Sequence, residues 1–126
     1  MLTSRQENHG ARLMTENDAR YFAGIVDGEG WIDCRRRIKK CSNNKFYKCS
    51  SIHVEVQMNH KGVMEWLKEK AGFGTLNIRR ARHKQNFDNW RWRCSFRDAY
   101  KLAKDILPFS IVKKETLQRI VDHYEH

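Results

Sequence analysis

The sequence has no long apolar run, and its apolar stretches are far shorter than the ~20 residues of a membrane-spanning helix. Nothing in it is typical of a secretory signal peptide. The four cysteines, Cys34, Cys41, Cys49 and Cys94, form no C-x-x-C pair, which argues against a zinc site and favours reduced thiols. We therefore expect an intracellular protein without an export signal, and its compartment and host are not specified by the sequence.

Acidic residues are scarce relative to basic ones, with 15 Asp and Glu against 25 Lys and Arg, a formal net charge of +10. This imbalance predicts a polyanionic partner, most simply nucleic acid. The excess lies in two blocks, because residues 31–48 and 79–97 each hold seven basic and one acidic side chain, a net +6 apiece. A basic protein with no specific partner is the alternative. The length of 126 residues predicts one domain over 15–126, preceded by a flexible segment over 1–14.

Both basic blocks alternate with period two, which indicates strands with one apolar and one polar face. The first block begins WIDCRRRIKK and is followed by SIHVEVQMN (51–59), with the polar stretch CSNNKFYKCS as the expected link. The second hairpin joins TLNIRRAR (75–82) to WRWRCSFR (90–97) through the polar turn HKQNFDN. In this last strand the apolar face is formed by Trp90, Trp92, Cys94 and Phe96.

Helices are expected before, between and after the hairpins. KGVMEWLKEKA (61–71) has helical apolar spacing, DAYKLAKDIL precedes the helix-breaking Pro108, and a final helix covers about 112–124. The order α-β-β-α-β-β-α-α predicts an α+β fold with a four-stranded antiparallel sheet and helices on one face.

The other face of this sheet is expected to bind double-stranded DNA, because a twisted ribbon of two strands fits the major groove. Its Arg and Lys side chains suit phosphates and guanine edges, and its Gln and Asn side chains suit adenine. A merely solvated strand face is the alternative. The candidate contacts are Asp33, Arg35, Arg37, Lys39, Ser51, His53, Glu55, Gln57, Asn59, Thr75, Asn77, Arg79, Arg91 and Arg93.

Residues 21–33, YFAGIVDGEGWID, lead from a helical apolar stretch into two acids interleaved with glycines. Thr15 and Asp18 predict a capping box, so the helix begins near residue 16, and the glycines after Val26 are expected to end it. Acids are unfavourable at a helix C-terminus and beside a DNA-binding surface unless a cation intervenes. Because Mg²⁺ binds carboxylates together with phosphate oxygens, acids beside a basic surface suggest phosphodiester hydrolysis. The stretch D-G-E-G taken by itself favours an ordinary loop.

The stretch FAGIVDGEG (22–30) resembles the LAGLIDADG motif of homing endonucleases, with Glu29 in place of the second acid. The element order of that family covers about residues 16–124, and LPFSIVKKETL (107–117) is similar to its later segment, in which a Pro-aromatic pair precedes a lysine. The resemblance implies a saddle-shaped αββαββα fold. It also implies Mg²⁺-dependent, site-specific cleavage of double-stranded DNA, with Mn²⁺ as another usable cation, by a protein encoded in a mobile intron or similar element. Neither a membrane nor a small-molecule cofactor is implied.

The same resemblance implies roles for particular residues. Glu29 would coordinate the catalytic ion, with the Gly28 carbonyl as a second ligand, and Lys113 would lie near the scissile phosphate. His60 falls where relatives position a water molecule, and an ordinary helix-entry histidine is the alternative. Asp27 is expected to be structural at the foot of the helix.

The chain contains one such motif, and members of this family pack two motif helices together through small residues. One copy therefore implies a homodimer that cuts a long pseudo-palindromic site and leaves short 3′ overhangs. The residues expected at the dimer interface are Phe22, Ala23, Gly24 and Asp27.

Two other functions stay open. A non-cleaving DNA-binding regulator or an RNA-splicing maturase could share the fold, although the presence of both Glu29 and Lys113 favours the enzyme. A small RNA-binding module would expose aromatic rings on the polar face of the sheet, whereas Trp90, Trp92 and Phe96 are expected on the opposite face.

Overall fold

The structure, a computed structural model, describes residues 14–40, 46–79 and 89–125, without the side chains of residues 36–40 and 46–50. The expected flexible segment over 1–14 and the expected turn HKQNFDN therefore lie almost wholly outside the described residues. The elements in chain order are α2 (Glu16–Glu29), β1 (Gly30–Lys40), β2 (Phe46–Met58), α3 (Lys61–Ala71), β3 (Thr75–Arg79), β4 (Asn89–Ser95), α4 (Arg97–Ile106), the 3₁₀-helix η1 (Leu107–Phe109) and α5 (Lys114–Glu125). This order confirms the predicted α+β fold.

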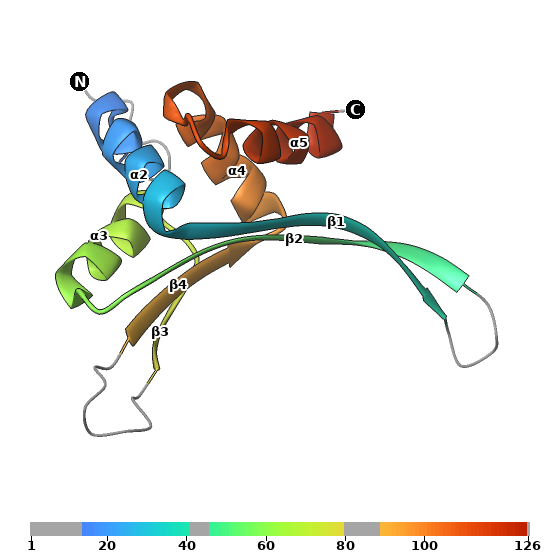
Figure 1. Ribbon diagram of the computed structural model, residues 1–126, viewed down its shortest axis with the longest axis horizontal. Coiled ribbons are helices and arrows are strands. Elements are labelled where there is room, and N and C mark those ends of the chain that lie inside the picture. The colour runs from blue at the N-terminus through green and yellow to red at the C-terminus, as the bar shows by residue number, and fades with distance from the viewer. Residues whose placement is uncertain (1–13, 41–45, 80–88, 126) are drawn as a thin grey trace.

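The four strands form one antiparallel sheet in the order β1-β2-β4-β3. The two predicted hairpins therefore lie side by side through β2 and β4. Figure 1 shows the helices on one side of this sheet, which arches so that its other side is concave and uncovered. None of the helices in the described ranges is long and apolar enough to cross a membrane.

The core lies between the helices and the apolar side of the sheet. Strand alternation places Ile52, Val54, Val56, Trp92 and Cys94 on this side, and all five are buried, which confirms the predicted parity of the second and fourth strands. The neighbouring positions Arg91 and Arg93 therefore face the concave side, together with the polar residues of β1 and β2.

The fully buried Trp92 fixes the turn between α3 and β3. Its Nε1 donates a hydrogen bond to the Phe73 carbonyl at 3.1 Å. Gly74 follows with φ +97°, and a Cβ at this position would lie 2.5 Å from the Trp92 Nε1. Only glycine adopts this conformation readily and leaves room for the indole.

Two predicted boundaries were wrong. Strand β2 begins at Phe46 rather than near residue 51, because its pairing with β1 continues to Lys40. This outer part of the hairpin extends beyond the helices (Figure 1), and its sequence has no clear apolar alternation to mark it as strand. Helix α2 ends at Glu29 rather than after Val26, because Gly28 remains helical and the Gly30 N–H bonds to the Val26 carbonyl.

Candidate active site and nucleic-acid interface

Glu29 is the last residue of α2, at the point where the chain enters β1. The capping box that begins this helix is present, since the Asp18 N–H donates to Thr15 Oγ1 and the Thr15 N–H donates to Asp18 Oδ2, both at 3.1 Å. At the other end, the last turn of α2 contains no basic side chain, and Glu29 is exposed. Its carboxylate therefore adds to the negative end of the helix dipole and attracts a cation.

Asp27, two residues earlier, holds the segment between η1 and α5. Its Oδ1 accepts hydrogen bonds from the Ser110 hydroxyl at 2.6 Å and the Lys113 N–H at 3.2 Å. Its Oδ2 accepts from the N–H groups of Ile111 at 2.7 Å and Val112 at 3.2 Å. Partial burial acts to raise the pKa of Asp27, but these hydrogen bonds outweigh it, so the pKa lies below the ordinary 3.8. Asp27 is thus engaged by the protein itself, as a structural carboxylate would be.

Lys113 reaches the same end of α2. Its ammonium Nζ donates a hydrogen bond to the backbone carbonyl of Asp27 at 2.8 Å. The Asp27 carboxylate also holds the Lys113 backbone, so both ends of the lysine are fixed. The structure therefore brings Lys113 to the helix end that carries Glu29, although the two residues are 84 positions apart in the sequence.

A divalent cation would find suitable donors here. The exposed Glu29 carboxylate and the neighbouring Gly28 carbonyl are oxygen donors of the kind that Mg²⁺ prefers. Among the described residues, no group of three or more His, Cys, Asp or Glu side chains could hold a metal ion. The donors of one chain therefore fit part of a magnesium site, to which phosphate oxygens or a second chain would contribute.

His60 makes the contact of a helix N-cap. Its Nδ1 accepts a hydrogen bond from the Val63 N–H at 3.1 Å at the start of α3. This contact is the helix-entry alternative considered for this residue. His60 is also exposed, so its other ring nitrogen remains accessible.

The concave face carries an acid beneath an arginine. Asp33 is only 5% exposed, and its Oδ1 accepts from Arg35 Nε at 2.6 Å. Its Oδ2 accepts from Arg35 Nη2 at 3.3 Å and from the Ser51 hydroxyl at 2.6 Å. Hydrogen bonding and the charge of Asp33 raise the pKa of Arg35. Asp33, predicted to contact DNA, is instead covered, and Arg35 is the exposed member of the pair.

A second acid on this face has a comparable position. Glu55 Oε2 accepts from Gln57 Nε2 at 2.7 Å, and its Oε1 lies 4.0 Å from Arg93 Nη1. The Glu55 side chain is 12% exposed and that of Arg93 is 37% exposed. The carboxylates of Asp33 and Glu55 are thus less exposed than the arginine side chains that they bind.

Most of the remaining residues predicted to contact DNA are exposed, as the alternation along their strands predicts. Thr75, Asn77 and Arg79 are exposed along β3, and Asn59 is exposed after β2. Arg37 and Lys39 belong to β1, but their side chains lie outside the described residues.

Two aromatic residues of the concave side did not stand out in the sequence. Trp31 pairs with Glu55 and is 51% exposed. Phe96, predicted on the apolar face, is 48% exposed and packs edge-on against His53, with ring centroids 5.5 Å apart. The reason is local, because Phe96 leaves the strand with φ +53°, which reverses the expected alternation. His53 also bonds through Nδ1 to the Ser95 hydroxyl at 2.7 Å.

The structure places the four residues expected at a dimer interface in different surroundings. Phe22 and Ala23 are fully buried in the chain's own core, so they cannot contact a second chain. Asp27 is occupied by the segment before α5. Gly24 is exposed, as is Gly28 one turn later, and a Cβ on either would meet no atom within 4 Å.

The exposed glycines have apolar neighbours. Tyr21, one turn before Gly24 on α2, is 56% exposed and packs edge-on against Trp66. On the Asp27 side of the helix, Ile111 and Val112 are 85% and 72% exposed. We call the set Tyr21, Gly24, Gly28, Ile111 and Val112 the α2 edge.

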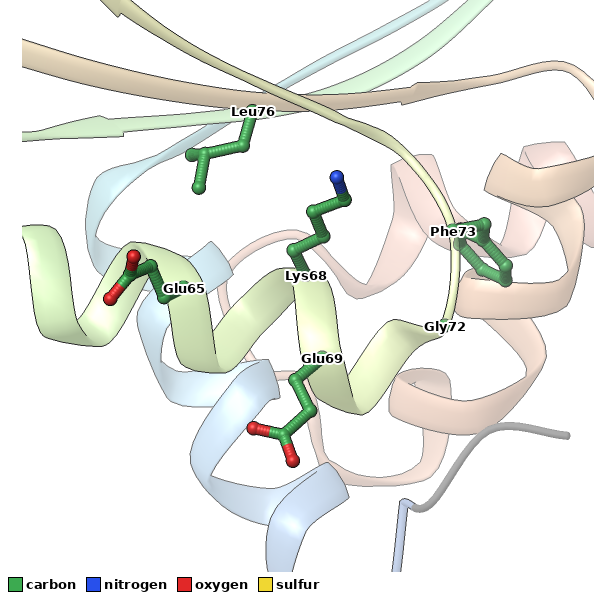
Figure 2. Close-up of a pocket in the computed structure, with 6 residues that line it drawn as sticks. All are labelled: Glu65, Lys68, Glu69, Gly72, Phe73 and Leu76. Carbon is green, nitrogen blue, oxygen red and sulfur yellow. The ribbon is translucent and has the colours of Figure 1, made fainter. Parts of the chain in front are cut away.

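A pocket of about 470 Å³ lies elsewhere, between α3 and β3. It is lined by Glu65, Lys68, Glu69, Gly72, Phe73 and Leu76, and Figure 2 shows Leu76 directed from β3 toward α3. Its lining includes neither Glu29 nor Lys113, and its two carboxylates disfavour a polyanion.

Solved structures of homing endonucleases have the same fold. I-CvuI, solved with its target in the presence of calcium, aligns over 82% of this chain and 62% of its own, with 14% identity and a TM-score of 0.61. The archaeal intron-encoded I-Vdi141I, complexed with DNA, aligns over 85% and 66%, with 18% identity and a TM-score of 0.63. I-SmaMI, bound to uncleavable DNA, aligns over 83% and 35%, with 18% identity and a TM-score of 0.60.

This chain thus spans less than two thirds of the length of I-CvuI and about a third of I-SmaMI. No protein-family model and no curated protein matches its sequence. The agreement in element order, sheet and helix placement is with the solved structures, and on that basis the chain has the homing-endonuclease fold.

Proposed function

We propose that this chain is a site-specific endonuclease that hydrolyses double-stranded DNA with a divalent cation and acts as a homodimer. The observation that carries the proposal is the exposed Glu29 carboxylate at the end of α2, next to a concave face rich in arginine. An acid at that position opposes both the helix dipole and DNA binding unless a cation lies between them. The likeness in fold to proteins solved with DNA supports the same function.

Different residues of this chain have different roles in this reaction. Arginines and amides of the concave face bind the duplex, and Glu29 with the Gly28 carbonyl holds the cation. Mg²⁺ or Mn²⁺, when bound, activates water and neutralises charge at the phosphate. Lys113 uses one of its three N–H donors on the Asp27 carbonyl, which leaves two for a phosphate oxygen or a water molecule. Asp27 keeps this lysine in place through the four hydrogen bonds that it accepts.

A second copy of the chain would complete this site. The α2 edge offers two glycines that let a partner helix approach closely, flanked by exposed apolar side chains. Packing one α2 edge against another would bring two Glu29 carboxylates together over one duplex and make the target pseudo-palindromic.

Gly24→Leu tests the dimer. Its side chain would enter open space in the single chain, so folding should be preserved while dimer formation is lost. Lys101→Leu, an equally exposed apolar substitution on α4, is the matched control and should leave the mass unchanged. Solution mass measured by light scattering, with and without duplex DNA, decides the point. A wild-type mass of one chain in both conditions would overturn the homodimer.

Cleavage is tested by incubating the protein with a library of long duplexes and Mg²⁺. Wild type should produce specific nicks, and Glu29→Gln should produce none while still binding the same duplexes. Glu69→Gln, an exposed acid on α3, is the matched control and should cleave normally. Cleavage that survives in Glu29→Gln would refute the assigned role of this residue, and binding without any cleavage by wild type would favour a regulator.

The exposed rings of Trp31 and Phe96 favour a second candidate, an RNA-binding protein such as a maturase. Aromatic side chains on a polar sheet face are suited to stacking unpaired bases. Trp31→Ala separates the two functions, because it should weaken binding to structured RNA far more than binding to duplex DNA if RNA is the ligand.

A further inference from the structure

The pair formed by Asp33 and Arg35 is unusual for a face that binds a polyanion. The Asp33 side chain is 4% exposed and that of Arg35 is 62% exposed, so the carboxylate lies beneath the guanidinium. Asp33 Oδ1 accepts from Arg35 Nε at 2.6 Å and Oδ2 from Nη2 at 3.3 Å. Ser51, directly opposite Arg35 on β2, donates its hydroxyl to the same Oδ2 at 2.6 Å.

This geometry leaves a defined part of the guanidinium available. Arginine has five N–H donors in a rigid plane, and Asp33 uses the side formed by Nε and Nη2. None of the residues that the structure describes bonds to the end of the group, which is formed by one N–H of each terminal nitrogen. Two parallel donors of this kind match the O6 and N7 acceptors of guanine in the major groove.

We propose that Arg35 reads a guanine in each half-site and that Asp33 is the positioning residue that fixes its orientation. This inference rests on the proposed DNA-binding function and adds a specific base contact to it. A phosphate contact requires no such orientation, because an arginine that only neutralises charge can remain free to rotate. The buried acid lowers the net charge of the face, so its presence is explained by orientation rather than by attraction.

The experiment measures sequence preference in wild type, Asp33→Asn, Arg35→Ala and Glu69→Gln. Each protein is bound to a randomised duplex library without divalent cation, and the bound fraction is sequenced. Wild type should prefer guanine at one base pair of each half-site by roughly 5- to 150-fold. Arg35→Ala should abolish that preference, and Asp33→Asn should reduce it severalfold although Asp33 would not touch the DNA. Glu69→Gln, with the same change of charge at an exposed acid on α3, should leave that base pair unaffected.

Pure electrostatics makes the opposite prediction for Asp33→Asn, since removal of a negative charge would tighten binding to all sequences alike and preserve the preference. That result overturns the inference, as does an Arg35→Ala protein that loses affinity equally for every sequence. If Asp33→Asn proves unfolded by circular dichroism, Ser51→Ala replaces it and should reduce the preference at the same base pair. A wild-type protein that binds no duplex at all would instead refute the proposed function.

Discussion

Replacing Asp27 by asparagine should destabilise the fold much more than replacing Glu29 by glutamine, although both acids end the same helix. Asparagine keeps one acceptor oxygen but turns an amide donor toward N–H groups that now donate to Asp27. The carboxylate accepts four hydrogen bonds at 2.6 to 3.2 Å from the segment before α5. Each oxygen accepts two of these hydrogen bonds. A hydrogen bond to a charged group contributes about 1.5–3 kcal/mol, so losing the two bonds of one oxygen should cost about 3–6 kcal/mol.

Glu29→Gln should change the free energy of unfolding by no more than about 0.5 kcal/mol, because its side chain is exposed. Removal of its charge from the helix C-terminus is mildly favourable. DNA cleavage should nevertheless be lost in this variant, whereas Asp27→Asn should reduce cleavage by displacing Lys113.

Urea unfolding followed by tryptophan fluorescence measures both variants, with the buried Trp92 as a reporter of the core. Two protein concentrations are needed, since a dimer would make the midpoint depend on concentration. The reasoning fails if Asp27→Asn unfolds within about 0.5 kcal/mol of wild type. It fails equally if Glu29→Gln loses more stability than Asp27→Asn.

Three further results are expected. The folded-state pKa of Asp27 lies below 3.8, so the ionised side chain stabilises the fold fully above that pH, and this stabilisation is lost as the pH falls through the folded pKa. The difference in unfolding free energy between wild type and Asp27→Asn should therefore shrink between roughly pH 5 and pH 2. A difference that stays constant over this range would contradict the prediction. Cys94 is 3% exposed, and burial raises the pKa of its thiol. A thiol reagent at neutral pH should therefore modify Cys94 only after unfolding, and labelling of the native protein at Cys94 would contradict its burial in the core. Gly74→Ala should cost about 1–3 kcal/mol in urea unfolding, because its φ of +97° and the Trp92 indole leave no room for a Cβ; a stable Gly74→Ala would show that this turn can relax.

The sheet was predictable where one of its faces is buried. Alternation in SIHVEVQMN placed Ile52, Val54 and Val56 in the core, and the structure agrees. The same signal was absent over 46–50, where β2 continues beyond the helices, so that stretch was predicted to be a polar link. The prediction that Phe96 lies on the apolar face was wrong for a different reason, because alternation in the sequence does not reveal a positive φ at the end of a strand.

The site was predictable only in part, since its contacts join distant segments. The motif helix and the later lysine could be picked out by resemblance, but not the hydrogen bonds from Ser110 and the following amides to Asp27, 83 or more residues away. Nor could a pattern of residues show which side of α2 faces inward. Ala23 and Gly24 are both small and adjacent, yet Ala23 is buried in the core and Gly24 is exposed.

The partners of the acids explain why a basic face contains any acids at all. Asp27 satisfies amides of its own chain, and Asp33 and Glu55 lie beneath arginines of the concave face, so each of these charges is bound within the protein. Glu29 differs because it is exposed at the negative end of a helix, where neither the fold nor a polyanion favours it. A carboxylate in that position lowers stability slightly, and in the proposed function a bound cation offsets this cost. Glu29 is therefore the candidate cation ligand because, unlike Asp27, Asp33 and Glu55, it is exposed and is not held by the hydrogen bonds and ion pairs that engage those three acids.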